Sequence, residues 1–262
     1  MCGRFVVDRK SSDLISLFDV DVSGDTLPEP SWNIAPTELI AIVLDALPKQ
    51  GADSLSTDKL SAEKLSAQAE PEYVPIEPVR RLEAARWGLV PSWSKDPNAG
   101  PPLFNARSED VADKASFKTA VKKRRAVIPA TGYYEWRVVD GAKVPHFISL
   151  PGDELVLFAG LYEWWRKPDA TDDDPDRWLL SASILTRASA GPLADIHDRM
   201  PVFLDADLVE EWLDPVEEGS QELVDEVAAG GAEVAERMEF HEVGAAVGSV
   251  KNNSPELMAA LN

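Results

Sequence analysis

The sequence predicts an α+β protein built on a mostly antiparallel, barrel-like β-sheet with peripheral helices. Two observations lead to this prediction. Apolar stretches of strand length follow one another at hairpin spacing over residues 125–186, with polar or glycine-containing turns between them. Apolar residues at helical spacing occur before and after this region, and we find no internal repeat. Strands and helices that are segregated along the chain in this way are typical of the α+β class.

Strands are predicted where short apolar or alternating runs lie between turn residues. Two polar connections interrupt them, a loop at 91–102 that is rich in Pro, Trp and Ser, and a loop at 169–176 that is rich in Asp. The predicted strands are 3–8, 39–44, 83–90, 125–129, 133–139, 145–150, 155–165, 178–186, 200–204 and 238–247.

Four helices are predicted from apolar residues at helical spacing. Ser11 or Ser12 is placed to cap the first of them. The second has an apolar side that includes Val111 and Val121. The predicted helices cover 11–18, 110–123, 206–213 and 221–228.

The length of the chain is compatible with a single domain over residues 1–262. Residues 46–78 are rich in Ala, Ser, Pro, Glu and Lys and show no strong apolar period. This composition favours a surface insertion rather than a linker between two domains. An acidic C-terminal portion begins near residue 205.

The composition excludes several classes of site. The chain has one cysteine, so it cannot form an internal disulfide. Its three histidines, His146, His197 and His241, lie far apart and lack metal-ligand spacing, so we expect neither a metal nor another cofactor. The longest apolar runs are far shorter than the roughly 20 residues of a membrane span. The N-terminus also lacks an apolar signal core, so we expect a cytoplasmic monomer with no membrane partner.

Charge is distributed unevenly along the chain. The formal net charge is −20, which taken alone argues against binding to nucleic acid. Residues 86–137, however, carry ten basic and five acidic side chains, whereas residues 205–262 carry two basic and fifteen acidic ones. A basic middle segment can therefore bind phosphate although the whole chain is acidic.

Cys2 is the candidate nucleophile. Removal of Met1 would give this residue a free α-amine, whose ordinary pKa is about 7.7–8.0, beside its thiol. Such a 1,2-aminothiol condenses with an aldehyde, because the amine forms an imine and the thiol then closes a five-membered thiazolidine ring. An N-terminal cysteine can also attack an amide, and a buried cysteine without a chemical role remains the alternative.

Three further segments carry residues that fit proton transfer or phosphate binding. Asn105 and Arg107 follow the loop that holds Trp93, although Asn105 could instead cap the next helix. Glu135 lies in an aromatic-rich strand where burial would raise the pKa of its carboxyl group, or it could be an exposed strand residue. His197 lies in a short turn beside Asp198, where it is either a proton shuttle or an ordinary surface histidine.

Seven motifs occur in an order that closely resembles the SRAP family, the SOS-response-associated peptidases, also described as abasic-site processing proteins. The resemblance covers about residues 1–215, with the 46–78 stretch longer than usual. The motifs are MCGRF (1–5), WNIAPT (32–37), RWGLVPSW (86–93), NARSE (105–109), TGYYEW (131–136), FAGLYEW (158–164) and IHDRMP (196–201).

This resemblance implies a DNA-damage function. Family members bind abasic sites in single-stranded DNA and form a thiazolidine DNA–protein crosslink through the N-terminal cysteine. We therefore expect single-stranded DNA with abasic sites as the partner, at the nucleoid. The implied catalytic residues are Cys2, Asn105, Glu135 and His197, the implied phosphate contacts are Arg4, Arg107 and Arg199, and Trp93 matches a stacking aromatic.

Some members carry a second aromatic where this chain has Ser94, which puts the stacking contact in question. Lyase activity could follow, because an imine acidifies the neighbouring C–H bond of the sugar. Self-processing by the same residues, which would release Met1, is a variant of this function.

Two other functions stay open. The first is an amide hydrolase, since class II glutamine amidotransferases also begin with MCG. Their Gly-Asn-Gly segment and the synthase domain that follows are absent from this sequence. The second is a non-catalytic protein that binds damaged DNA through its basic segment, with Cys2 incidental.

Overall fold

The computed structural model describes residues 2–48 and 77–261. Most of the predicted insertion at 46–78 therefore lies outside the described residues. The strands are β1 (Phe5–Val7), β2 (Val22–Ser23), β3 (Ser31–Ile34), β4 (Leu39–Ala46), β5 (Val79–Trp87), β6 (Asn105–Arg107), β7 (Arg125–Ala130), β8 (Gly132–Val139), β9 (Ala142–Ser149), β10 (Val156–Arg166), β11 (Trp178–Ala188), β12 (Arg199–Pro201) and β13 (Glu239–Glu242). The α-helices are α1 (Ser11–Leu17), α2 (Lys118–Lys123), α3 (Val209–Leu213) and α4 (Gln221–Glu236).

Five strands close into a barrel. The order β11–β10–β7–β4–β5 is antiparallel throughout, and β5 then pairs in parallel with β11 to complete the ring. Three short strands extend this sheet: β6 runs parallel to β11, β12 runs antiparallel to β11, and β2 runs parallel to β5. The predicted α+β class with a mostly antiparallel, barrel-like sheet is confirmed.

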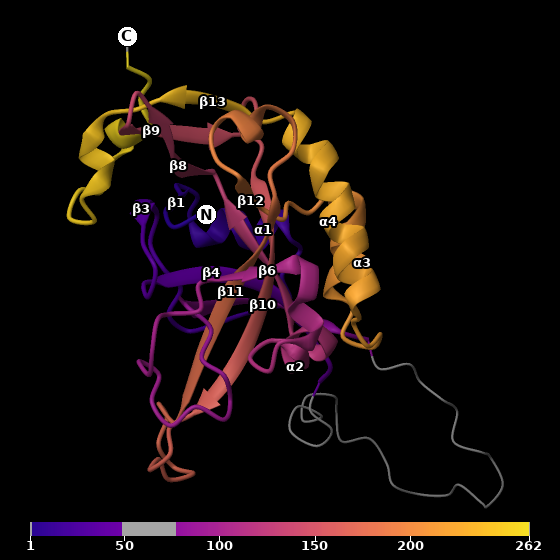
Figure 1. Ribbon diagram of the computed structural model, residues 1–262. Helices are drawn as coiled ribbons and strands as arrows, with labels where there is room; N and C mark the ends of the chain where they lie inside the picture. Colours follow the sequence, from indigo (N-terminus) through magenta and orange to yellow (C-terminus); the bar gives the residue numbers. More distant parts are fainter. Residues whose placement is uncertain (1, 49–76, 262) are drawn as a thin grey trace, which may run out of the picture.

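A second sheet covers one end of the barrel, in the strand order β13–β9–β8–β1–β3 (Figure 1). β8 pairs with β1 on one side and with β9 on the other. β1 therefore lies between β3, which comes from the beginning of the chain, and β8, which comes from its middle. The two sheets and α4 contribute to one large hydrophobic core, which includes Phe5, Phe158 and Val227.

Most of the predicted strands are confirmed, with shifted ends. β5 begins and ends several residues earlier than 83–90, and the strand predicted at 238–247 ends at Glu242. The short strands β2, β3 and β6 have no counterpart among the predicted ones, because two to four residues carry no measurable alternation.

The helix predicted at 110–123 is wrong. In its place lies a 3-10 helix, Ser108–Asp113. It is followed by Lys114, whose backbone is extended, and α2 begins only at Lys118. Val111 and Val121 are both fully buried. Both apolar side chains therefore reach the core although the helix is broken at Lys114.

Two other helix details differ from the prediction. The residue before α1 is Lys10, and neither Ser11 nor Ser12 caps the helix; the Ser11 hydroxyl donates instead to the Pro28 carbonyl at 3.4 Å. α4 continues eight residues past the predicted end at 228. The helix runs through Gly231. A Cβ at this position would lie 2.6 Å from the backbone oxygen of Phe203, so a glycine here permits the close packing of the helix.

Candidate functional site

Cys2 lies just before β1 and is fully buried in the main core. The Asn105 side chain reaches it, since Asn105 Nδ2 donates to the Cys2 carbonyl oxygen at 2.7 Å. Asn105 begins β6, whose parallel pairing with β11 sets Asn105 opposite Ile184. The pairing of β6 with β11 therefore places Asn105 against a residue 103 positions away in the chain.

Glu135 comes to the same place on β8. The β1–β8 pairing sets Phe5 opposite Tyr133, and the Tyr134 N–H donates to the Arg4 carbonyl at 2.9 Å. Glu135 is 6% exposed, and its charge acts electrostatically on the Cys2 thiol. Its Oε1 also accepts from the Trp136 N–H at 3.2 Å. A buried carboxylate therefore lies close enough to the candidate nucleophile to influence its protonation.

His197 shares a cavity with Glu135. The cavity measures about 370 Å³ and is lined by Glu135, Trp136, Val138, Lys143, His197 and Gly248. His197 follows a 3-10 helix, Gly191–Asp195, and its backbone N–H donates to the Leu193 carbonyl at 3.2 Å. The structure therefore brings together the four predicted catalytic residues. Asn105 hydrogen-bonds to Cys2, and the charge of Glu135 acts on the Cys2 thiol. His197 lines the same cavity as Glu135.

The His197 ring makes two polar contacts through Nδ1. This atom lies 2.9 Å from the Arg199 backbone N–H and 2.7 Å from Asp198 Oδ1. The two contacts need opposite states of the ring, because the N–H requires a lone pair on Nδ1 whereas the carboxylate requires a proton there. The two contacts therefore suit different tautomers of the ring, one with its proton on Nδ1 and one with its proton on Nε2.

The surroundings of Cys2 keep its thiol protonated. Burial raises the pKa of this thiol well above its usual range, and the negative charge of Glu135 raises it further. The backbone N–H of Arg4 acts in the opposite direction by hydrogen bonding to the sulfur. At neutral pH the sulfur is therefore a neutral S–H group.

This protonation predicts slow alkylation of Cys2. In the folded protein we expect iodoacetamide to react at least about tenfold more slowly than in urea, with a rate that keeps rising from pH 7 to 9 without a plateau, because the thiolate stays a small fraction of the thiol over this range. Mass spectrometry of time points measures the rate. An alkylation rate that levels off near pH 8 would contradict the raised pKa.

Asn105 keeps one polar atom available. Its Oδ1 is buried and has no hydrogen-bond partner within the described part of the chain. A buried acceptor left in this state is costly unless a ligand or water donates to it. A hydroxyl or amine bound beside Cys2 would meet that acceptor.

The three predicted phosphate-binding arginines differ in their contacts. Arg107 is exposed at the end of β6, and among residues 2–48 and 77–261 nothing forms a hydrogen bond with its side chain. Arg199 instead forms an ion pair with Glu109 and donates to the Thr186 carbonyl at 2.7 Å. Arg4 points inward, and Nη1 donates to Asn33 Oδ1 at 2.8 Å. Their role in binding DNA stays a prediction.

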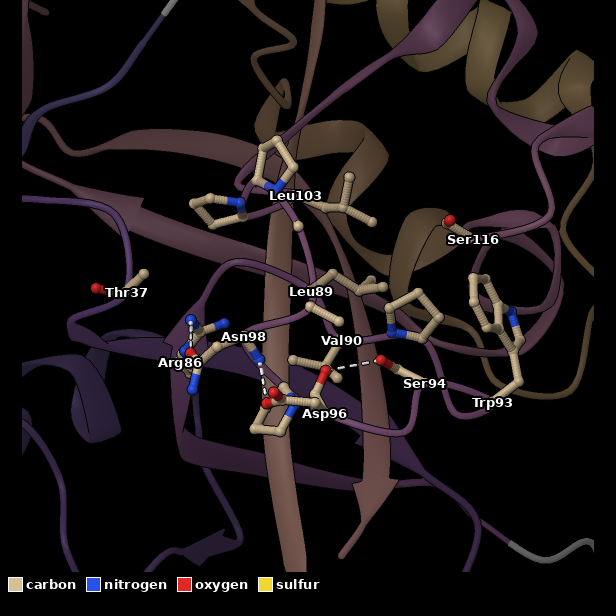
Figure 2. A pocket seen from close by; sticks show the side chains of 16 residues that line it. Thr37, Arg86, Leu89, Val90, Trp93, Ser94, Asp96, Asn98, Leu103 and Ser116 are labelled. Atoms are coloured by element: carbon tan, nitrogen blue, oxygen red, sulfur yellow. Dashed lines mark hydrogen bonds between the residues drawn. The ribbon is translucent and has the colours of Figure 1, made fainter. Parts of the chain in front are cut away.

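Trp93 lies on the loop between β5 and β6, 67% exposed (Figure 2). It lines a second cavity of about 370 Å³, on the side away from Arg86, with Leu89 and Val90 between the two. Ser94 holds the loop: its Oγ donates to the Asp96 carbonyl at 2.8 Å, and its own carbonyl accepts from Trp165 Nε1 at 2.7 Å. An exposed indole on an anchored loop is suited to stacking.

Two residues for which no role is predicted from the sequence also make notable contacts in the structure. Asn33, from the motif at 32–37, is 3% exposed and connects Arg4 to the C-terminal segment. Arg86 lies half-buried without a carboxylate partner within the described residues, and burial lowers the pKa of its guanidinium. A polar residue inside an apolar motif is the available signal for Asn33, but its partners in the C-terminal segment are more than 200 positions away.

The fold and the cluster around Cys2 define a class of protein. The model of one family, SOS response associated peptidase (SRAP), matches residues 1–250. The chain belongs to the SRAP family. Its N-terminal cysteine, flanked by an asparagine, a glutamate and a histidine, thus lies in a recognised family fold.

Curated relatives cover nearly the whole chain. Abasic site processing protein YoqW of Bacillus subtilis (strain 168) is 34% identical over 98% of this chain and 99% of its own. Abasic site processing protein YedK of Escherichia coli (strain K12) is 29% identical with the same coverage. Abasic site processing protein HMCES of Xenopus tropicalis is 32% identical over 70% of this chain and 58% of its own.

Solved structures share the fold. A crystal structure of a protein from Bacteroides thetaiotaomicron superposes with a TM-score of 0.70 at 19% identity, covering 100% of both chains. Another, from Bordetella bronchiseptica, has a TM-score of 0.62 at 20% identity and covers 93% of this chain and 100% of that one.

Within the described residues, no group of His, Cys, Asp and Glu side chains is arranged to hold a metal, and none of the helices is long and apolar enough to cross a membrane.

Proposed function

We propose that this protein processes abasic sites in DNA by capturing the aldehyde of the sugar covalently on Cys2. The observation that carries the proposal is the contact of Cys2 with Asn105 and the influence of Glu135 on its thiol, inside the core of a SRAP protein. The relatives named as abasic site processing proteins support the choice of substrate.

The reaction follows from the groups present. Once Met1 is removed, the Cys2 amine attacks the aldehyde carbon of the open sugar, and loss of water gives an imine. The sulfur then adds to the imine carbon, and its proton passes to the nitrogen, so that a thiazolidine ring closes. Because both nucleophiles belong to one residue, the second attack is intramolecular, which lowers its barrier by several kcal/mol.

The neighbouring residues take defined parts. Glu135 takes a proton from the attacking amine and gives it to the leaving water, and it later passes the thiol proton to the ring nitrogen. His197 transfers protons that open the closed sugar and that later reverse the crosslink. Asn105 Oδ1, the buried acceptor without a partner in the described structure, holds a sugar hydroxyl or the amine.

DNA binding is assigned to exposed groups. The exposed guanidinium of Arg107 offers a bidentate contact to phosphate, and Trp93 offers a stacking surface. Arg199 would have to exchange Glu109 for a phosphate to make such a contact. Single-stranded DNA is the preferred substrate, because a small cavity next to a buried nucleophile admits an unpaired sugar more readily than one within a duplex.

A denaturing gel tests the proposal. Protein whose Met1 removal has been verified by mass spectrometry is incubated with a labelled single-stranded oligonucleotide that carries one abasic site. A shifted band that survives denaturation is expected, and protein that retains Met1 should give none, because its cysteine has no free amine. A shift in native gels alone would indicate a non-covalent DNA-binding protein and contradict the proposal.

A further inference from the structure

A turn near the C-terminus closes one side of the catalytic cavity. We call residues 245–253 the C-terminal turn. Gly248 of this turn lines the cavity that holds Glu135 and His197. Val247 is fully buried and packs with Val6 beneath it. In Figure 1 this segment, shown in yellow, lies beside β9 and near β3.

Asn33 holds the C-terminal turn by its side-chain amide. Nδ2 donates to three carbonyl oxygens of the turn: Asn252 at 2.7 Å, Ser249 at 3.0 Å and Val247 at 3.4 Å. Its Oδ1 accepts from Arg4 Nη1 at 2.8 Å. Asn33 is 3% exposed, and both polar atoms of its buried side chain have partners. Nδ2 joins β3 to the turn, and Oδ1 joins it to Arg4.

Arg4 links the same turn to the nucleophile. Its Nη1 donates to the Val247 carbonyl at 2.9 Å as well as to Asn33. Its backbone N–H hydrogen-bonds to the Cys2 sulfur. Arg4 therefore contacts Cys2 through its main chain and the C-terminal turn through its side chain.

We propose that Asn33 and Arg4 are positioning residues, which hold the C-terminal turn so that Cys2, Glu135 and His197 act around one cavity. The inference rests on the proposed function for the reaction that is positioned. It assigns Arg4 Nη1 to the turn, because this atom serves two acceptors inside the protein, whereas Nε of the same guanidinium is buried without a hydrogen-bond partner among the described residues.

The expected consequence is a loss of rate without a loss of DNA binding. A displacement of about 1 Å in a reacting group can cost on the order of a hundredfold in rate. A phosphate contact behaves differently, because its removal weakens binding and lowers the dependence of affinity on salt by about 0.7 per contact with a single strand.

Two variants separate these roles. Asn33→Asp keeps the acceptor for Arg4 but places an oxygen against the three carbonyls of the turn, and Arg4→Gln removes the guanidinium. We expect the maximal crosslinking rate to fall roughly tenfold to a hundredfold in both, with the half-saturating DNA concentration and its salt dependence unchanged. Arg9→Gln is the matched control, since it removes a nearby charge whose partners are Asp8 and Asp153.

Hydrogen exchange provides a readout that needs no DNA. Amides of residues 245–253 should exchange faster in Asn33→Asp than in wild type. If wild type forms no crosslink, the proposed function fails while the exchange data still test the positioning role. Unchanged exchange, or an Arg4→Gln variant that crosslinks at the wild-type maximal rate with weaker, less salt-dependent binding, would overturn the inference.

A milder variant keeps the test valid if Asn33→Asp does not fold. Asn253 is exposed, and its Oδ1 accepts from the Trp32 N–H at 2.7 Å and from the Ser31 hydroxyl at 3.3 Å. Asn253→Ala therefore loosens the end of the turn without touching Arg4. A smaller drop in the maximal rate is expected, with unchanged binding; a wild-type rate together with faster exchange of the turn would contradict the positioning role.

Discussion

Cys2→Ala is expected to eliminate the denaturation-resistant crosslink, with a loss of more than roughly a thousandfold in its yield at a fixed time. The variant keeps the α-amine after Met1 removal but lacks the sulfur that closes the ring. It can still form an imine with the abasic aldehyde, and that imine hydrolyses when the protein is denatured. Quantitative denaturing gels measure the loss.

Reduction with borohydride separates the role of the amine from the role of the thiol. Reduction converts an imine into a stable amine, so it should restore a gel band for Cys2→Ala while adding little to wild type. The result would show that the amine attacks first and the thiol second. A full-strength band for Cys2→Ala without reduction would remove the sulfur from the mechanism and refute the assignment of Cys2.

Glu135→Gln is expected to slow crosslinking by about a hundredfold to ten-thousandfold, the range typical of a lost general acid or base. The amide keeps the size of the side chain and its contact with the Trp136 N–H. It can neither take the thiol proton nor deliver a proton to leaving water. Single-turnover rates at saturating DNA measure the effect.

The same variant should change Cys2 in the opposite sense. The charge of Glu135 raises the pKa of the thiol, so its removal lowers that pKa and increases the thiolate fraction at a given pH. Alkylation of Cys2 should therefore become faster while crosslinking becomes slower. A general loss of packing would not separate the two rates in this way.

Glu163→Gln is the matched control for Glu135→Gln. Glu163 is another buried glutamate, on β10, and it pairs with Arg124 at 3.1 Å instead of facing the cavity. Its substitution should lower stability and leave the crosslinking rate within about twofold of wild type. A wild-type rate in Glu135→Gln would show that Glu135 has no part in proton transfer.

Local patterns are enough to predict much of the fold and to single out the candidate nucleophile. The strands from β7 to β11 are predictable because their apolar residues are close in sequence and separated by turns. Cys2 is identifiable because its chemistry depends on its position beside the chain start, which needs no tertiary information. The motifs at 105–109, 131–136 and 196–201 likewise indicate Asn105, Glu135 and His197 from residue types and order alone.

Only the packing of the folded chain decides what these residues touch. The contact of Asn105 with Cys2 depends on a three-residue strand that pairs in parallel with β11, and such a strand leaves no local pattern. Arg4 and Arg199 look alike in sequence to the exposed Arg107, yet their guanidinium groups are used inside the protein.

Asn33 shows the physical reason most clearly. Its three acceptors lie 214 to 219 positions further along the chain. A hydrogen bond across such a separation is set by how strands pair and how the C-terminal turn packs, whereas residue spacing reports only neighbours within a few positions. The sequence by itself therefore predicts the candidate reactive group and the class of fold. The packing of distant segments determines which residues surround that group.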